Sequence, residues 1–215
     1  LQALTEIGFP HPVDCWLAIT ENRIGPTAYK SRDVVTALNG TTIEVIHTDA
    51  EGRMALADTL ALAGREDAGL IIDYATLTGA CYFALSDRYS GVFTNHALLN
   101  NVLIEAGRQS GERAWPFPMD ADFDDDLKSK IADIAQCATG SEADQILAAR
   151  FLQRFTPKQT PWVHIDLSAV TRKDGLGQVP GGLTGFGIRL TLNLLHEQAG
   201  AITQALGDGL PVAAP

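Results

Sequence analysis

The stretch IEVIHTDAEGRMALADTL, residues 43–60, brings three charged side chains together between two apolar runs. The residues before the charges are apolar and β-branched, which is typical of a buried strand. The residues after them are apolar with few polar positions on any face, which predicts a buried helix. Asp49, Glu51 and Arg53 therefore lie at the carboxyl end of a strand, the place where ligands bind in parallel α/β folds.

In this region we predict a strand over residues 44–47 and a helix that begins at Met54. The helical segment is predicted to be buried as far as residue 65. The two carboxylates can then point into one pocket. Carboxylate oxygens suit divalent cations such as Mg²⁺, Mn²⁺ and Zn²⁺. Two bridging ions activate a water molecule, and the planar guanidinium of Arg53 can hold an anion or a tetrahedral intermediate.

A purely structural interpretation of the same residues stays open. Asp49 can cap the helix, Glu51 can face the positive end of the helix dipole, and Arg53 can form an ion pair. The spacing of the three residues does not decide between this interpretation and a metal site.

The composition indicates an ordinary globular protein. The 215 residues are 46% hydrophobic and 20% charged, which suits one large domain or a domain with a lobe. The net charge of −10 argues against nucleic acid as a partner. No apolar run approaches the roughly 20 residues of a membrane span. Cys15, Cys81 and Cys137 are sparse and form no C-x-x-C pair, which favours a reducing compartment and buried thiols.

The chain opens with LQALTEIGFP, in which residues 1–7 have the pattern of a helix end stopped by Gly8 and Pro10. A domain that begins inside a helix is interpreted as a piece of a longer protein. A processed N-terminus is the alternative.

Short apolar runs alternate with helical patterns along the chain, which is typical of an α/β fold. Because the runs are continuously apolar, we predict a central mixed, mostly parallel sheet with helices on both faces. Asn39-Gly40 separates two β-branched runs and predicts a hairpin with a type I′ turn, which needs positive φ at both residues. The other predicted strands cover residues 13–20, 70–74, 91–95 and 162–167, and the other predicted helices cover residues 96–109, 144–155 and 188–198.

The six residues TDAEGR, 48–53, resemble the signature of the leucyl aminopeptidase family, also called the cytosol aminopeptidase or M17 family of di-metal peptidases. The segments LIIDYATLTGA, GERAWPFPM, WVHIDLSA and GGLTGFGIR resemble later family segments in the same order. The resemblance covers roughly residues 12–195 and implies an M17-like catalytic fold.

The resemblance also implies roles for individual residues. Asp49 and Glu51 would be metal ligands, with the Glu51 carboxylate bridging two ions. Arg53 would hold a bicarbonate or the transition state. Leu77 would offer its backbone carbonyl to the catalytic water or the substrate amine. The remaining residues implied to line the substrate pocket are Thr76, Thr78, Gly79 and Ala80.

For the complete enzyme, the resemblance implies a hydrolase that removes Leu-like N-terminal residues from peptides with two divalent ions, Zn²⁺ or Mn²⁺. It implies a cytoplasmic homo-oligomer, a hexamer, whose partner is a peptide substrate rather than nucleic acid or a membrane.

Two departures limit these implications. The family usually has Asn where this chain has His47, which we interpret as a hydrogen-bonded residue at the pocket rim rather than a metal ligand. The family's other ligands, a Lys and two Asp residues around a "GKG" segment, are not found before Asp49. Residues 1–215 are therefore expected to be the C-terminal part of the catalytic domain, without the N-terminal domain and the first half of the catalytic domain.

Such a chain is expected to be inactive on its own, because two carboxylates hold a divalent ion weakly. A non-catalytic assembly module with the same fold is the alternative function.

Overall fold

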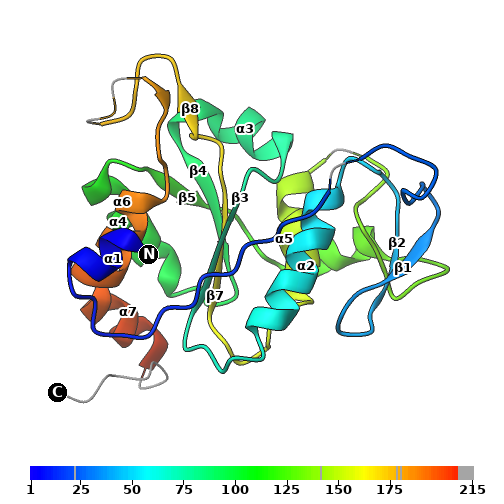
Figure 1. The fold of residues 1–215 in the computed structure, drawn as a ribbon, viewed down its shortest axis with the longest axis horizontal. Helices are drawn as coiled ribbons and strands as arrows, with labels where there is room; N and C mark the ends of the chain where they lie inside the picture. The colour runs from blue at the N-terminus through cyan, green and yellow to red at the C-terminus, as the bar shows by residue number, and fades with distance from the viewer. Residues whose placement is uncertain (22, 141, 178, 180, 208–215) are drawn as a thin grey trace. The chain divides into compact units, whose positions relative to one another are not determined.

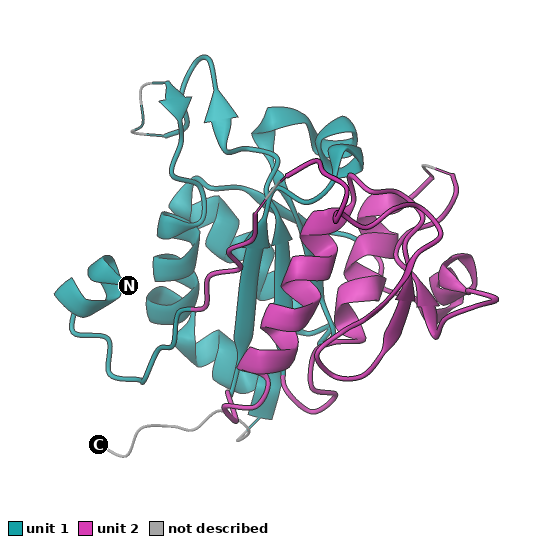
Figure 2. Cartoon of the chain, turned by 45° about the vertical axis from the view of Figure 1, so that its right-hand side comes forward, with its two compact units in different colours: residues 1–15, 69–117, 161–215 teal, residues 16–68, 118–160 magenta. Residues whose placement is uncertain are grey.

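The computed structural model describes residues 1–21, 23–140, 142–177, 179 and 181–207. The chain forms two compact units, coloured separately in Figure 2. Unit 1 contains residues 1–15, 69–117 and 161–215, and unit 2 contains residues 16–68 and 118–160. Both units combine helices with a sheet, so the predicted mixed α/β class is confirmed.

Unit 1 is built on a four-stranded sheet with the order β3-β7-β4-β5. Its strands are β3 (Ile71–Ala75), β7 (Trp162–Asp166), β4 (Ser90–Thr94) and β5 (Ala114–Pro116). The β3/β7 and β4/β5 pairs are parallel, whereas β4 runs antiparallel to β7 (Figure 1). The sheet is therefore mixed and mostly parallel, as predicted, and the carboxyl ends of β3 and β7 share one edge.

One face of this sheet supports the core of unit 1. Val163 and Ile165 alternate along β7 and pack with Val92 and with apolar residues of the surrounding helices. These helices are α4 (Leu99–Ser110), α6 (Ile188–Leu192), the π-helix η3 (Asn193–Glu197) and α7 (Ala199–Leu206). The helix predicted over residues 96–109 is α4, and it ends at Gly111 in a left-handed conformation with φ 75°.

Shorter elements complete unit 1. They are α1 (Gln2–Glu6), α3 (Gly79–Leu85), the 3₁₀ turn η1 (Ser86–Arg88), β8 (Thr171–Arg172) and β9 (Gly182–Leu183). The helical pattern predicted over residues 1–7 forms α1. The β8/β9 pair is antiparallel. In the described part of the chain, no helix is both long enough and apolar enough to cross a membrane.

Unit 2 has a small three-stranded sheet and two longer helices. The strands are β1 (Val34–Thr36), β2 (Thr42–Glu44) and β6 (Ile134–Ala135), and the helical elements are α2 (Glu51–Ala63), the 3₁₀ helix η2 (Ala121–Leu127) and α5 (Asp144–Gln153). Strand β2 is central, antiparallel to β1 and parallel to β6. Helices α2 and α5 lie side by side (Figure 1).

The hairpin predicted at Asn39-Gly40 is confirmed, but its turn is not type I′. Of the two residues only Gly40 has positive φ, at 87°. The loop closes instead through the Ala37 amide, which donates to the Thr41 carbonyl at 2.8 Å. The Asn39 side chain accepts from the Thr41 amide at 3.0 Å. The loop is longer than a two-residue type I′ turn, and its left-handed position is taken by glycine. This explains why Asn-Gly occurs in a hairpin whose turn is not type I′.

Two sequence predictions are wrong around residue 15. Residues 13–20 were expected to be a buried strand, but they are exposed and belong to no strand. A strand needs a neighbour to pair with its backbone groups, and an apolar run alone does not supply one. Cys15 is exposed for the same reason, whereas Cys81 and Cys137 are buried as predicted.

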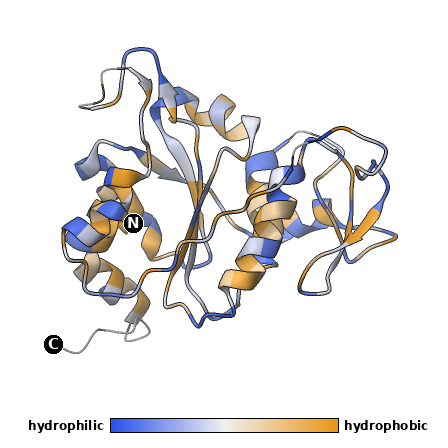
Figure 3. Ribbon diagram, in the orientation of Figure 1, coloured by the Kyte–Doolittle hydropathy of each residue, from blue (hydrophilic) through white to orange (hydrophobic). Residues whose placement is uncertain are grey.

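Helix α2 begins earlier than predicted, at Glu51 rather than Met54, and the preceding strand ends at Glu44 rather than residue 47. The helix is apolar over most of its length (Figure 3). Its buried positions are Arg53, Ala57, Leu60 and Ala63, which repeat at helical spacing along one face. The charged side chains of the TDAEGR segment therefore lie in the turn before α2 and in its first turn.

Candidate functional site

The turn between β2 and α2 carries both predicted metal ligands. Asp49 is exposed in the turn, and Glu51 is half-buried as the first residue of α2. Within the described ranges neither carboxylate forms an ion pair. The N-cap position belongs to Ala50, with no side-chain cap, so the interpretation of Asp49 as a cap is wrong. Glu51 lies in the first turn, where a negative charge is favourable.

The side chain of Gln136 holds the backbone of this turn through hydrogen bonds. Its fully buried side chain accepts through Oε1 from the backbone amides of Ile46 and His47, at 3.2 and 3.1 Å. Its Nε2 donates to the Ala50 carbonyl at 2.9 Å. One amide group thus binds the backbone on both sides of Asp49, and sequence reasoning missed it because nothing local marks Gln136.

His47 has the local hydrogen bond expected of a structural residue. Its Nδ1 accepts from the Asp49 backbone amide at 3.2 Å, and the ring is exposed. This bond helps to hold the turn.

Arg53 is buried, with 3% of its surface exposed. Its Nη2 donates to both carboxylate oxygens of Asp144, at 3.0 and 3.1 Å, and its Nη1 donates to the Gln136 carbonyl at 3.3 Å. The ion-pair interpretation of Arg53 is therefore confirmed. The partner, Asp144, opens α5, and its position at a helix start was the only sequence signal available for it.

Tyr29 lies close enough to Glu51 for the two groups to influence each other. Burial and the Glu51 carboxylate raise the pKa of Tyr29 above its ordinary value. The phenolic oxygen is buried and has no hydrogen-bond partner among the described residues. A phenol with a raised pKa keeps its proton at neutral pH.

The donor set of this turn fits a hard or borderline divalent cation. Asp49 and Glu51 offer unpaired carboxylate oxygens two residues apart, which are the ligands that Mn²⁺, Mg²⁺ and Zn²⁺ accept. Over the described ranges, no cluster of three or more His, Cys, Asp or Glu side chains is arranged to hold a metal.

The turn predicted to line a substrate pocket follows β3 in unit 1. Thr78 is the N-cap of α3, and its hydroxyl accepts from the Cys81 amide at 3.2 Å. The same hydroxyl donates to Asp166 Oδ2 at 2.6 Å, and the Leu77 and Thr78 amides donate to Asp166 Oδ1 at 3.0 and 3.2 Å. One carboxylate thus accepts three hydrogen bonds, two from backbone amides and one from the Thr78 hydroxyl, and fixes this turn.

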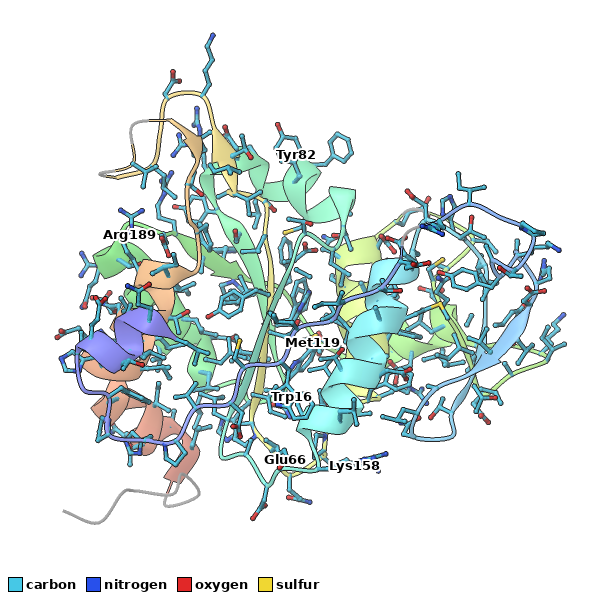
Figure 4. The ribbon with its side chains drawn as sticks, viewed as in Figure 1. Trp16, Glu66, Tyr82, Met119, Lys158 and Arg189 are labelled. Carbon is cyan, nitrogen blue, oxygen red and sulfur yellow. The ribbon has the colours of Figure 1, made fainter. Side chains whose placement is uncertain are left out.

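The surface of the turn is open to solvent. Thr76 and Gly79 are exposed, whereas Leu77, Thr78 and Ala80 are half-buried. Beyond them, Tyr82 projects outward from α3 (Figure 4).

Asp166 is almost fully buried at the end of β7, on the sheet face opposite the core of unit 1. Burial raises the pKa of this carboxyl, while His164 and the hydrogen bonds from Thr78 and Leu77 oppose the rise. Asp73, next to His164 in the sheet, accepts from its Nδ1 at 2.6 Å and from Trp162 Nε1 at 2.6 Å. No local sequence signal marks Asp73 or Asp166 as partners of these groups.

The predicted site residues fall in different units. Asp49, Glu51 and Arg53 belong to unit 2, and the turn over residues 76–80 belongs to unit 1. Unit 2 also has a cavity of about 660 Å³, whose lining includes Glu44, Cys137 and Glu142 but none of the three predicted residues of that unit.

Comparisons with known proteins agree on one family. The model of the cytosol aminopeptidase family, catalytic domain, matches residues 1–192. A probable cytosol aminopeptidase of Syntrophotalea carbinolica is 46% identical over 179 residues, which are 83% of this chain and 36% of the relative. One of Chlorobaculum tepidum is 41% identical over 196 residues, which are 91% of this chain and 39% of the relative. The chain therefore spans well under half the length of these curated relatives.

A solved structure agrees with the sequence comparisons. A mutant of tomato leucine aminopeptidase matches with a TM-score of 0.74 and 36% identity, over 81% of this chain and 34% of that one. The agreement in fold extends the family match to the tertiary structure.

Proposed function

The chain belongs to the cytosol aminopeptidase family, and from this premise we propose that it is part of a metal-dependent aminopeptidase that removes Leu-like N-terminal residues from peptides. The observation that carries the proposal is the turn before α2, which presents the unpaired carboxylates of Asp49 and Glu51 within the TDAEGR segment. We propose that residues 1–215 form the C-terminal part of the catalytic domain, and that further metal ligands come from elsewhere in the complete enzyme.

Asp49 and Glu51 would hold divalent ions, two in the complete enzyme and either Zn²⁺ or Mn²⁺. Bound there, the metal would supply a Lewis acid that polarises a peptide carbonyl and lowers the pKa of water. Gln136 would hold the backbone of the turn that carries the two carboxylates.

The turn over residues 76–80 would bind the N-terminal residue of the peptide. The Leu77 carbonyl would accept a hydrogen bond from the substrate amine or the attacking water, and Thr76, Thr78, Gly79 and Ala80 would line the pocket. Support comes from Asp166, whose hydrogen bonds orient the Leu77–Thr78 backbone. Arg53 would add positive charge close to the metal ligands. We further propose a cytoplasmic homo-hexamer for the complete enzyme.

The test is hydrolysis of leucine 4-nitroanilide by the complete enzyme that contains residues 1–215, with Mn²⁺ or Zn²⁺, compared with N-acetyl-leucine 4-nitroanilide. An aminopeptidase needs the free amine, so only the first substrate should be cleaved, and EDTA should abolish cleavage. Metal titration by native mass spectrometry is run on the same sample and on Asp49→Asn and Glu51→Gln. Both variants should bind Mn²⁺ at least about tenfold more weakly, whereas the exposed control Glu66→Gln should not.

The outcomes separate the two candidate functions. Cleavage that resists EDTA, or that ignores the acetyl block, contradicts the aminopeptidase. Absence of both cleavage and metal binding at Asp49 and Glu51 favours the non-catalytic assembly module.

A further inference from the structure

A row of buried polar side chains lies along one face of β7. Trp162, His164 and Asp166 alternate with the residues that face the core of unit 1, and none of the three is more than 1% exposed. Asp73 lies beside His164 in the neighbouring strand β3. This face of the two strands therefore carries two acids and an imidazole next to both, a set of groups that is costly to bury unless its charges are matched.

Both carboxylates are arranged as hydrogen-bond acceptors. Asp73 accepts from Trp162 Nε1 through its Oδ2 at 2.6 Å, and its Oδ1 lies 2.6 Å from His164 Nδ1. Asp166 accepts from two backbone amides and one hydroxyl of the turn over residues 76–80. An ionised carboxylate only accepts hydrogen bonds, whereas a protonated one also has a proton to donate. The donors around these two acids therefore favour the ionised form of both.

His164 has the surroundings of a cation. Its hydrogen bond to Asp73 is short, as charge-assisted bonds are. The rings of Phe93 and Trp162 lie next to its own ring, with centroids 5.7 and 6.1 Å away, and aromatic rings attract a cation at about this range. Burial raises the pKa of Asp166 whereas His164 lowers it, so the imidazole opposes the neutral form of that acid.

We propose that His164 carries a positive charge between Asp73 and Asp166, and that this charge holds the turn over residues 76–80 by keeping Asp166 ionised. Protonation of Asp166 would weaken all three hydrogen bonds to the turn, because bonds to an ionised group are about twice as strong as neutral ones. His164 is therefore a positioning residue, which acts on the turn only through Asp166.

The other groups that unit 1 places around Asp166 are uncharged at neutral pH over the described ranges. Its register partners in the two flanking strands are an alanine and a glycine. From α3, the Cys81 thiol donates to the Asp166 carbonyl at 3.6 Å, and burial raises the pKa of this thiol to about 11. The charge of Asp166 is therefore set by His164, whose own charge is supported by Asp73.

The consequence for an aminopeptidase rests on the proposed function of the turn. If the turn binds the N-terminal residue of the peptide, loss of the His164 charge should raise KM more than it lowers kcat. This effect should grow as the pH falls and Asp166 takes up a proton. The charge itself, and the hold on the turn, are tested without peptide or added metal.

Solid-state NMR of the complete enzyme that contains residues 1–215 measures the charge. The sample carries 15N-labelled histidine and 13C-labelled tryptophan. Because the Trp162 ring stacks on the His164 ring, a contact between the two labels assigns the His164 signals. We expect two N–H signals from this ring at pH 7. A single N–H signal would show a neutral ring and would overturn the proposal.

Hydrogen exchange of the same enzyme measures the hold on the turn. The side-chain amide of asparagine can donate to Asp73 in place of His164 Nδ1, so His164→Asn removes the charge and keeps that bond. In this variant the Leu77 and Thr78 amides should lose protection about tenfold between pH 8.5 and pH 5.5, after correction for intrinsic rates, as Asp166 takes up a proton. The wild type should keep its protection over this range.

Two further variants serve as controls. Asp166→Asn has no carboxyl group to titrate, so its addition to His164→Asn should abolish the pH dependence. His196→Asn replaces an exposed histidine and should leave the protection of the turn as it is in the wild type.

Three exchange results would contradict the proposal. They are a loss of protection at pH 5.5 in the wild type, protection in His164→Asn that does not depend on pH, and a pH dependence that survives the addition of Asp166→Asn. If His164→Asn does not fold, the wild type decides, because two N–H signals with constant protection support the proposal and any other result opposes it. Failure of the peptidase assay leaves these readouts unaffected, since they use neither peptide nor metal.

Discussion

Asp166 and Thr78 connect the carboxyl ends of two parallel strands of unit 1. The Thr78 hydroxyl donates to Asp166 Oδ2 at 2.6 Å, and its backbone amide donates to Oδ1 at 3.2 Å. The same hydroxyl caps α3 by accepting from the Cys81 amide. A single side chain thus sets both the turn after β3 and the start of the helix that follows.

Replacing Thr78 by valine should destabilise the protein by about 2 kcal/mol, because a helix cap and a hydrogen bond to a carboxylate are both lost. Thr78→Ser keeps the hydroxyl and should stay within about 0.5 kcal/mol of the wild type. Urea denaturation of the two variants measures the difference. Equal stability of the valine and serine variants would show that the hydroxyl has no such role.

Replacing Gln136 by leucine should cost about 3 kcal/mol, because two backbone amides and one carbonyl lose their buried partner. Hydrogen exchange gives the sharper measurement, since the Ile46 and His47 amides should exchange faster in this variant. The exposed residue Gln159, replaced in the same way, serves as the control and should change nothing. Unchanged exchange at both amides would contradict the role assigned to Gln136.

The stability of unit 2 should depend on Asp124 at low pH. Hydrogen bonds and charge from Arg150 hold the pKa of this carboxyl below its usual range. A depressed folded-state pKa contributes stability above the unfolded-state pKa of about 4, and this stability is lost as the pH falls through the folded-state value. Asp124→Asn should therefore be about 1 kcal/mol less stable at pH 6, and the difference should shrink below about pH 3.

Chemical denaturation at pH 6 and pH 2.5 measures this effect, with the exposed residue Asp122 replaced by Asn as the control. A stability difference for Asp124→Asn that is equally large at both pH values would exclude the carboxylate as its source.

The thiols should differ in reactivity according to their burial. Cys15 is exposed, whereas burial raises the pKa of Cys81 to about 11 and raises that of Cys137 as well. Since the thiolate is the reactive species, a disulfide reagent at pH 8 should modify Cys15 rapidly and the other two only after unfolding. Cys15→Ser should remove the fast phase, and a fast phase that survives this change would contradict the assignment.

Much of the fold was predictable because its signals are local. Apolar runs predicted β3, β4 and β7, and the helical pattern ended by Gly111 predicted α4. Residues 13–20 carry the same kind of run without forming a strand, because strand formation also requires a partner. Periodicity reports which face of a segment can be buried, not what will pair with it.

For the candidate site too, local features were predictable from the sequence, whereas contacts between distant residues were not. The sequence by itself determined the family and the local order of Asp49, Glu51 and Arg53, because these lie within five residues of each other. The tertiary structure alone decided their partners, since Gln136 and Asp144 approach the segment from about 90 residues away, and Asp166 approaches Thr78 from 88. Hydrogen bonds and ion pairs act over a few ångströms of space, whatever the distance along the chain, so only folding selects which of many similar acids meets a given arginine or amide.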